Sequence, residues 1–77
     1  MHPIRTLDQL PTGQQAAVVS LSAPPGQSRR LLELGFAPGR AVTALQESPW
    51  GDPVAYGVCG AVIALRKADA QHIYIEA

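Results

Sequence analysis

Covalent cross-links cannot hold this protein together, because its 77 residues include a single cysteine, Cys59. No disulfide can form within the chain, which excludes the small secreted scaffolds that depend on several of them. We therefore expect a reducing environment and a cytoplasmic protein. Cys59 follows Val58 in an apolar segment, where a free cysteine is usually a small hydrophobic residue of the core, so we predict that it is buried.

A net charge is also missing: six basic residues balance six acidic ones, and no run of like charge exceeds two. This argues against a nucleic-acid partner and against attachment to an anionic membrane, both of which need a basic surface. The longest apolar candidate, Ala61–Leu65, is far shorter than the roughly 20 residues that cross a bilayer, so we expect no direct membrane insertion. The first ten residues have no apolar stretch typical of a signal peptide.

Recognisable catalytic motifs are lacking too. No glycine-rich loop leads into a helix with the lysine and hydroxyl residue that would bind a nucleotide phosphate. Neither histidine, His2 or His72, lies near Cys59 in the sequence, so no pair of nucleophile and base is indicated. A core this small leaves little room for a cleft with several positioned polar groups. We expect a single domain over residues 1–77 that is not an enzyme.

Metal ligands do not cluster in the sequence. A structural zinc site would show paired cysteine or histidine residues at short spacing, and none occurs here. His72 and Glu76 lie four positions apart, but on a strand this spacing separates them by about 13 Å, too far to bind one ion. We therefore predict no tight metal site and no cofactor, and a weak metal site on the surface stays open. The isolated residues with suitable ligand atoms are His2, Glu47, Asp52, Cys59, Asp69, His72 and Glu76.

Glycine and proline residues divide the sequence into short segments. Residues 27–34 are good helix formers, and Gly35 follows where a left-handed residue often closes a helix, with Phe36 placed to pack back on Leu31. We expect a mostly β fold: a small barrel of about five antiparallel strands, with one α-helix inserted after the first strand and short helical turns near the termini. The expected strands are 14–21, 40–47, 54–59, 61–65 and 73–76, and the expected helical turns are 7–10 and 67–71.

The turn at residues 48–53 is the first candidate for binding a partner protein. It contains Pro49, Asp52 and the only tryptophan, Trp50. The indole either folds back over the small core or anchors an interface, since tryptophan is enriched among interface hot spots. Both interpretations are open from the sequence.

Two further candidates are the arginine doublet and a tyrosine. Arg29 and Arg30 lie on the predicted helix, either as solvated surface charges or as bidentate contacts to acidic groups of a partner. Tyr74 is expected to point outward from an edge strand, where it would support the same kind of contact.

Most of these segments resemble the ferrous iron transport protein A (FeoA) family. Residues 29–39, RRLLELGFAPG, are very similar to the RRLLELGLTPG segment of that family, and residues 48–53, SPWGDP, are similar to its APLGDP turn. Residues 63–67 resemble its LALRK strand end, residues 70–75 its closing strand, and residues 7–13 its LPPG start. The order and spacing of the motifs are kept over almost the whole chain.

The resemblance implies an SH3-like barrel that assists ferrous iron uptake by docking on the large membrane transporter FeoB, through its cytosolic GTPase region. FeoA-like domains also occur at the C-terminus of iron-dependent repressors, but this chain shows no helix-turn-helix and ends at Ala77, so we expect the standalone protein. Two alternatives stay open: a transition-metal-binding regulatory domain, and an SH3-like partner for an iron-dependent repressor.

The chain departs from the family pattern at three positions. Trp50 stands where the family usually has leucine, Val62 stands where a polar residue is common, and Cys59 is not a family hallmark. Trp50 and Val62 are expected to enlarge an apolar patch, which would favour weak self-association or a tighter partner contact. No metal-ligand pattern is implied at the matching positions.

Overall fold

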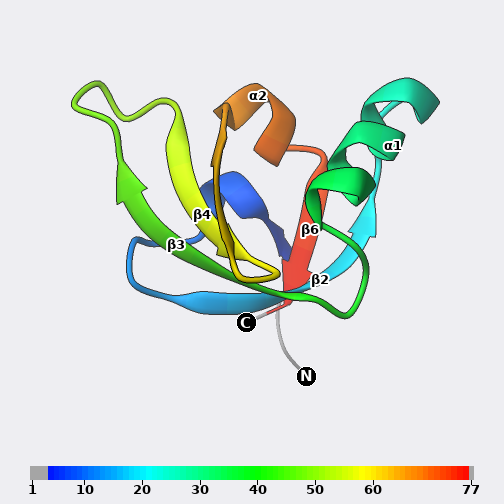
Figure 1. Cartoon of the computed structure of the whole chain (residues 1–77), viewed down its shortest axis with the longest axis horizontal. Coiled ribbons are helices and arrows are strands. Elements are labelled where there is room, and N and C mark those ends of the chain that lie inside the picture. The colour runs from blue at the N-terminus through cyan, green and yellow to red at the C-terminus, as the bar shows by residue number, and fades with distance from the viewer. Residues whose placement is uncertain (1–3, 77) are drawn as a thin grey trace.

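Antiparallel strands are the main regular secondary structure between residues 4 and 76, the range that the computed structural model describes. Six strands pair into one sheet in the order β1-β6-β2-β3-β4-β5. Figure 1 shows that the sheet is strongly curved and that α1 and α2 lie along the same side of it. The elements are β1 (Ile4–Thr6), the 3₁₀ turn η1 (Leu7–Gln9), β2 (Gln15–Leu21), α1 (Pro25–Leu34), β3 (Ala41–Glu47), β4 (Val54–Val58), β5 (Ala61–Leu65), α2 (Lys67–Ala70) and β6 (Ile73–Glu76).

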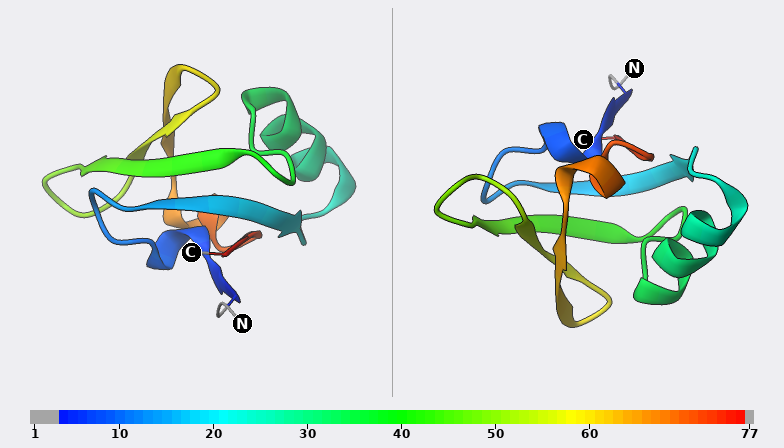
Figure 2. Two further views of the ribbon diagram at one scale, coloured as in Figure 1. Left: turned by 90° about the horizontal axis from the view of Figure 1, so that it is seen from below. Right: turned by 90° about the horizontal axis from the view of Figure 1, so that it is seen from above.

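The mostly β fold with one inserted helix confirms the sequence prediction, with one strand more than the five expected. The additional strand, β1, pairs with the last strand and places Ile4 opposite Glu76. Its three residues carry no pattern of their own, so only long-range pairing defines it, and α1 consequently follows the second strand rather than the first. Figure 2 shows β2 and β3 running side by side across the molecule, with α1 at one end.

The two end strands of the sheet, β1 and β5, do not pair with each other in the described range. The curved sheet is therefore left open, whereas closure as a barrel was expected to remove the exposed edges. The chain keeps a free strand edge along β5, which borders the helical side of the molecule (Figure 1).

The helix α1 begins and ends as its local sequence dictates. Pro25 occupies its first turn, where a missing N–H costs no hydrogen bond, so the helix starts two residues before the predicted position. Gly35 closes it at φ 113°, a left-handed conformation, and the Phe36 N–H donates to the Leu31 carbonyl oxygen at 3.0 Å. The predicted Schellman arrangement is thus confirmed. No helix among residues 4–76 is long and apolar enough to cross a membrane.

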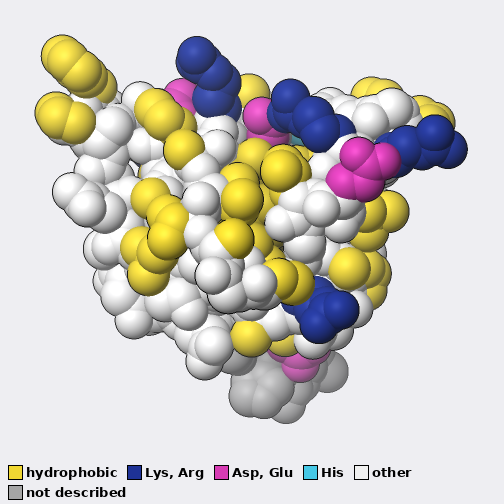
Figure 3. Space-filling view, in the orientation of Figure 1, with side chains coloured by type: hydrophobic (Ala, Val, Ile, Leu, Met, Phe, Trp, Pro, Cys, Tyr) yellow, Lys and Arg dark blue, Asp and Glu magenta, His cyan; other side chains and the backbone are white. Residues whose placement is uncertain are grey.

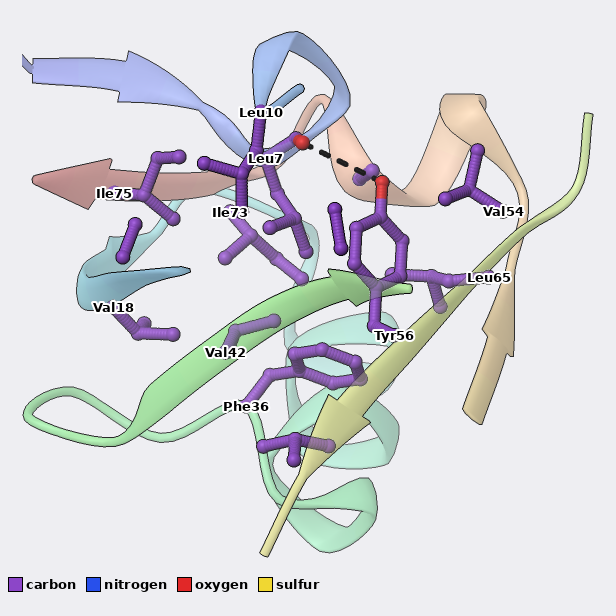
Figure 4. Packing of buried hydrophobic residues seen from close by; sticks show 14 of the residues in the cluster. Leu7, Leu10, Val18, Phe36, Val42, Val54, Tyr56, Leu65, Ile73 and Ile75 are labelled. Carbon is purple, nitrogen blue, oxygen red and sulfur yellow. Dashed lines mark hydrogen bonds between the residues drawn. The ribbon is translucent and has the colours of Figure 1, made fainter. Parts of the chain in front are cut away.

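Side chains from β2 to β6, from η1 and from both α-helices form one buried core (Figure 4). Val54, Tyr56 and Val58 alternate along β4 and are all buried, as their spacing predicts. The Phe36 and Tyr56 rings meet edge to face, with centroids 6.4 Å apart and planes at 88°, a favoured geometry for aromatic pairs. Phe36, which follows the residue that closes α1, is therefore anchored on β4, the strand after the turn at residues 48–53.

The Tyr56 hydroxyl is a polar group within this core. It donates a hydrogen bond to the Leu7 carbonyl oxygen at 3.4 Å, drawn as a dashed line in Figure 4. Burial, reinforced by the carboxylates of Asp8, Glu47 and Asp52, raises the pKa of Tyr56 to about 12. The side chain therefore stays neutral, and can donate its hydrogen bond, throughout the physiological pH range.

Two predictions about single residues are wrong. Cys59 is exposed, because it forms a two-residue hairpin turn with Gly60 in which both residues have positive φ, 53° and 77°. Because Cys59 lies in the turn, it does not continue the alternation of buried and half-buried residues along β4. Tyr74 alternates with the buried Ile73 and Ile75 and so faces outward as predicted, but it is half-buried and does not lie on an edge strand, because β6 is flanked by β1 and β2.

Candidate functional site

The turn between β3 and β4 presents the tryptophan to solvent. The Gly51 N–H donates to the Ser48 carbonyl oxygen at 2.8 Å, and the Ser48 N–H donates to the Pro53 carbonyl oxygen at 3.1 Å, so backbone hydrogen bonds close the turn. Trp50, at its tip, is 90% exposed. The indole does not cover the core, and the interface-anchor interpretation is the one that fits its position.

Asp52 connects this turn to α2. Its Oδ1 accepts a hydrogen bond from the Lys67 N–H at 2.9 Å. Lys67 is the first residue of α2, and the first N–H groups of a helix have no partner within the helix, so the carboxylate satisfies one of them. Asp52, predicted as a partner-binding residue, therefore has a structural contact that holds the exposed Pro49 and Trp50 next to α2.

Asp69 connects α2 to α1. Its two carboxylate oxygens accept hydrogen bonds from Arg30 Nη2 at 3.2 Å and from Gln27 Nε2 at 2.6 Å. Gln27 and Arg30 are three residues apart on one face of α1, so a single carboxylate fixes the orientation of the helix. The Arg30 side chain remains 60% exposed and keeps N–H donors for a partner, and Arg29 beside it is also exposed.

The short helix α2 thus joins both segments on one face of the molecule. The β3–β4 turn and α1 lie at the two ends of this face, with α2 between them, in Figure 1 and again from above in Figure 2. Charged side chains, dark blue and magenta, line the same edge in Figure 3. We name this surface the docking face; it consists of α2 with Arg29, Arg30, Pro49, Trp50 and Asp52.

Tyr74 and Val62 belong to other surfaces. Tyr74 lies on β6 opposite Thr6 of β1. Val62, 69% exposed, lines a shallow groove on the outer face of the sheet with residues of β3 and β4 that include Leu45. Trp50 is not part of that groove and lies beyond the other end of the β4–β5 hairpin, so the expected joint apolar patch of Trp50 and Val62 is not formed.

The described residues do not offer a preformed metal site. Within residues 4–76, no three histidine, cysteine, aspartate or glutamate side chains lie close enough together to hold an ion. The carboxylate of Asp69 is engaged by Arg30 and Gln27. Cys59 Sγ lies 3.8 Å from the Gly35 carbonyl oxygen rather than beside a base. His2 lies outside the described residues.

The contacts of Asp69 and Gln27 could not be foreseen from the sequence, although they organise the docking face. The two residues are 42 positions apart, and no local pattern links a glutamine on one helix to an aspartate on another. The one available signal was an acidic residue within the helical turn expected at 67–71, near a helix that carries an arginine doublet.

A family model described as the FeoA domain matches residues 5–77 of the chain. A curated relative, the Fe(2+) transport protein A/Fe(2+) transporter FeoB fusion protein of Porphyromonas gingivalis, is 37% identical over 70 residues. The match covers 91% of this chain and 8% of the fusion protein, so the chain corresponds to a small part of that relative.

Solved structures have the same fold. The solution structure of a FeoA protein from Chlorobium tepidum superposes with a TM-score of 0.85 at 32% identity, covering 92% of this chain and 68% of the other. A zinc complex of FeoA from Stenotrophomonas maltophilia, described as a prokaryotic SH3 domain protein, gives 0.79 at 34% identity, covering 91% of this chain and 87% of the other. The SH3-like fold that the resemblance implied is therefore confirmed.

Proposed function

This chain belongs to the FeoA domain family, and from that premise we propose that it is a cytoplasmic accessory protein of ferrous iron transport that docks on the cytosolic GTPase region of a FeoB-type membrane transporter. One observation carries the proposal: in the P. gingivalis relative, a segment 37% identical to this chain shares one polypeptide with the transporter. A covalent link keeps two modules at high effective concentration, which serves modules that act together. Where the two modules are not fused, a specific interface would take the place of that link.

The composition of the docking face supports this proposal. Trp50 offers a large exposed side chain of the kind that dominates binding energy at interfaces. Arg29 and Arg30 present guanidinium groups, which pair bidentately with carboxylates. The contacts of Asp52 and Asp69 already fix the turn and α1 relative to α2, so little conformational entropy is lost when a partner binds.

Docking changes iron uptake only if the chain binds one conformational state of the transporter more tightly than another. A tenfold preference corresponds to about 1.4 kcal/mol, which is enough to move a finely balanced equilibrium. In this account the GTP and iron chemistry belongs to the transporter, and the chain contributes a surface that favours one of its states.

Calorimetric titration of the isolated cytosolic GTPase region of the FeoB-type transporter tests the proposal. We expect saturable binding by the unmutated chain and a loss of at least tenfold in affinity for Trp50→Ala. Ile4→Ala is the matched control, because Ile4 is also an exposed apolar residue, at 60%, but lies on β1 away from the docking face. No saturable binding by the unmutated chain at concentrations up to about 1 mM, where even weak complexes form, would overturn the proposal.

Direct metal binding is a second candidate, favoured by the zinc complex of the S. maltophilia relative. The described residues of this chain contain no ligand cluster, so binding would need ligands from two molecules or a rearrangement. Titration with zinc, and with ferrous ion kept reduced, separates this candidate from docking: saturation below millimolar concentration supports it, and a flat titration rejects it.

A further inference from the structure

The strand β5 leaves one edge of the sheet open. It is the last strand in the sheet and pairs with β4 alone. The two-residue turn makes Val58 and Ala61 a hydrogen-bonded pair, so alternate residues from Ala61 onward turn their backbone groups toward β4. The backbone N–H and C=O groups of Val62 and Ala64 point away from β4, toward the open edge. Among residues 4–76 their N–H and C=O groups make no hydrogen bond to any loop, helix or strand across this edge.

This edge lacks the usual protection. Proteins blunt free strand edges with charged residues, proline or a covering element. The strand β5, AVIAL, contains neither charge nor proline, and Val62 is 69% exposed. An exposed apolar edge with unpaired backbone groups is suited to receive a further strand.

A groove of about 390 Å³ runs beside this edge, between β5 and α1. Leu34 of α1 and Ile63 of β5 line it, and both are half-buried against the core. Figure 1 shows β5 as the gold ribbon facing α1. Figure 3, in the same orientation, shows a yellow apolar surface in the middle of the view. An extended segment bound in this groove would form backbone hydrogen bonds with β5 and would pack its apolar side chains on Leu34 and Ile63.

The end of the groove near α2 is charged. Arg30, Arg66 and Asp69 line it. The Asp69 carboxylate is already bound by Arg30 and Gln27, whereas Arg66 is exposed and has no ion pair in the part of the chain that the structure describes. The groove therefore carries one more positive than negative charge, and a carboxylate on the bound partner would neutralise the excess.

We propose that the β5 edge binds an extended acidic segment of the partner protein, which adds a strand to the sheet. Its backbone bonds to Val62 and Ala64, an apolar side chain packs on Leu34 and Ile63, and a carboxylate pairs with Arg66. The inference rests on the proposed docking function and deepens it, because the groove opens between β5 and α1, next to the docking face.

The backbone of Ala64 allows a selective test. Ala64→Pro removes an N–H that points away from β4, and proline is tolerated at such outward positions of edge strands, so the fold is retained. Ala64→Val is the control of similar size that keeps the N–H. The probe is the cytosolic GTPase region of the FeoB-type transporter, and circular dichroism checks the fold of each variant. Amide hydrogen exchange at Val62 and Ala64 in the unmutated chain gives a second readout that needs no substitution.

We expect the probe to slow exchange at both amides at least tenfold, Ala64→Pro to weaken binding at least tenfold, and Ala64→Val to bind within threefold of the unmutated chain. Binding without protection of these amides, and unaffected by Ala64→Pro, would overturn the inference and leave docking intact. No binding by the unmutated chain would overturn both. Protection that appears when the chain alone is concentrated would assign the edge to a second copy and would also overturn the inference.

Discussion

The Arg30 guanidinium lies 3.2 Å from the Asp69 carboxylate, and this contact joins α1 to α2 across 39 positions of the sequence. Gln27 donates to the same carboxylate at 2.6 Å. Exposed ion pairs contribute little to stability, typically about 0–1 kcal/mol, so the main consequence of this cluster is orientation. It holds the arginine doublet in a fixed position relative to the turn at residues 48–53. That turn contacts the first residue of α2 through Asp52.

Removal of the Asp69 carboxylate should loosen α1 without unfolding the protein. For Asp69→Ala we expect a loss of about 1 kcal/mol or less in the free energy of unfolding, because Arg30 is largely solvated. Amide hydrogen exchange in α1 should become faster by a larger factor than the loss in the free energy of unfolding alone would produce. Glu33→Ala is the control, since Glu33 is an exposed carboxylate on the same helix. Equal exchange rates in both variants would contradict the orienting role.

Trp50 should matter for binding and hardly at all for folding. Because its side chain is 90% exposed, Trp50→Ala should change the free energy of unfolding by no more than about 0.5 kcal/mol in a urea titration. Phe36→Ala, which removes a fully buried ring, should cost about 3–5 kcal/mol in the same assay. A large loss of stability for Trp50→Ala would show that the indole packs on the protein after all.

Substitution of glycine by alanine should affect the free energy of unfolding differently within α1, at Gly26, and at the residue that closes it, Gly35. Gly35 has φ 113°, and a Cβ there would lie 3.1 Å from Cys59 Sγ, so Gly35→Ala should lower the free energy of unfolding by about 1–3 kcal/mol. Gly26 lies within the helix with nothing near its missing Cβ, so Gly26→Ala should be neutral or raise it by up to about 1 kcal/mol. Urea titrations measure both, and a Gly35→Ala variant as stable as the unmutated chain would contradict the strained conformation.

The buried Tyr56 hydroxyl should make stability fall at alkaline pH. Its pKa in the folded state, about 12, lies above the value of about 10 in an unfolded chain, so between these values the folded protein holds the proton more tightly. The stabilisation is complete below pH 10 and is lost as the pH rises toward 12. Tyr56→Phe should therefore show a smaller fall in unfolding free energy over this window. Parallel curves for the two proteins would refute the shift.

The sequence predicts most of the fold because its signals are local. Gly35 and Phe36 end α1 as expected, and the alternation of Val54, Tyr56 and Val58 places β4 correctly. The strand β1 is not predictable, because its three residues are defined by pairing with β6 at the far end of the chain. Cys59 is misplaced for a related reason: its apolar neighbours extend a strand pattern that the left-handed hairpin turn interrupts.

The candidate site is only partly predictable. The exposure of the arginine doublet follows from charge on a helix. Turn chemistry left open whether Trp50 covers the core or is exposed. What brings Trp50 and the doublet together does not follow from the sequence, because α2 joins them through Asp52 and Asp69, two contacts between residues 15 to 42 positions apart. The open edge of β5 depends on the order of strands in the sheet, and no property of that segment alone distinguishes an edge strand from a central one.

The central claim is that this chain docks on the transporter through one face. Chemical-shift mapping of the ¹⁵N-labelled chain, on addition of the unlabelled cytosolic GTPase region of the FeoB-type transporter, tests it most directly. The account predicts shifts that saturate and that concentrate in α1, α2, the neighbouring edge strand β5 and the turn at residues 48–53, including the indole N–H of Trp50. An unchanged spectrum, or saturable shifts confined to β1 and β2, would contradict it.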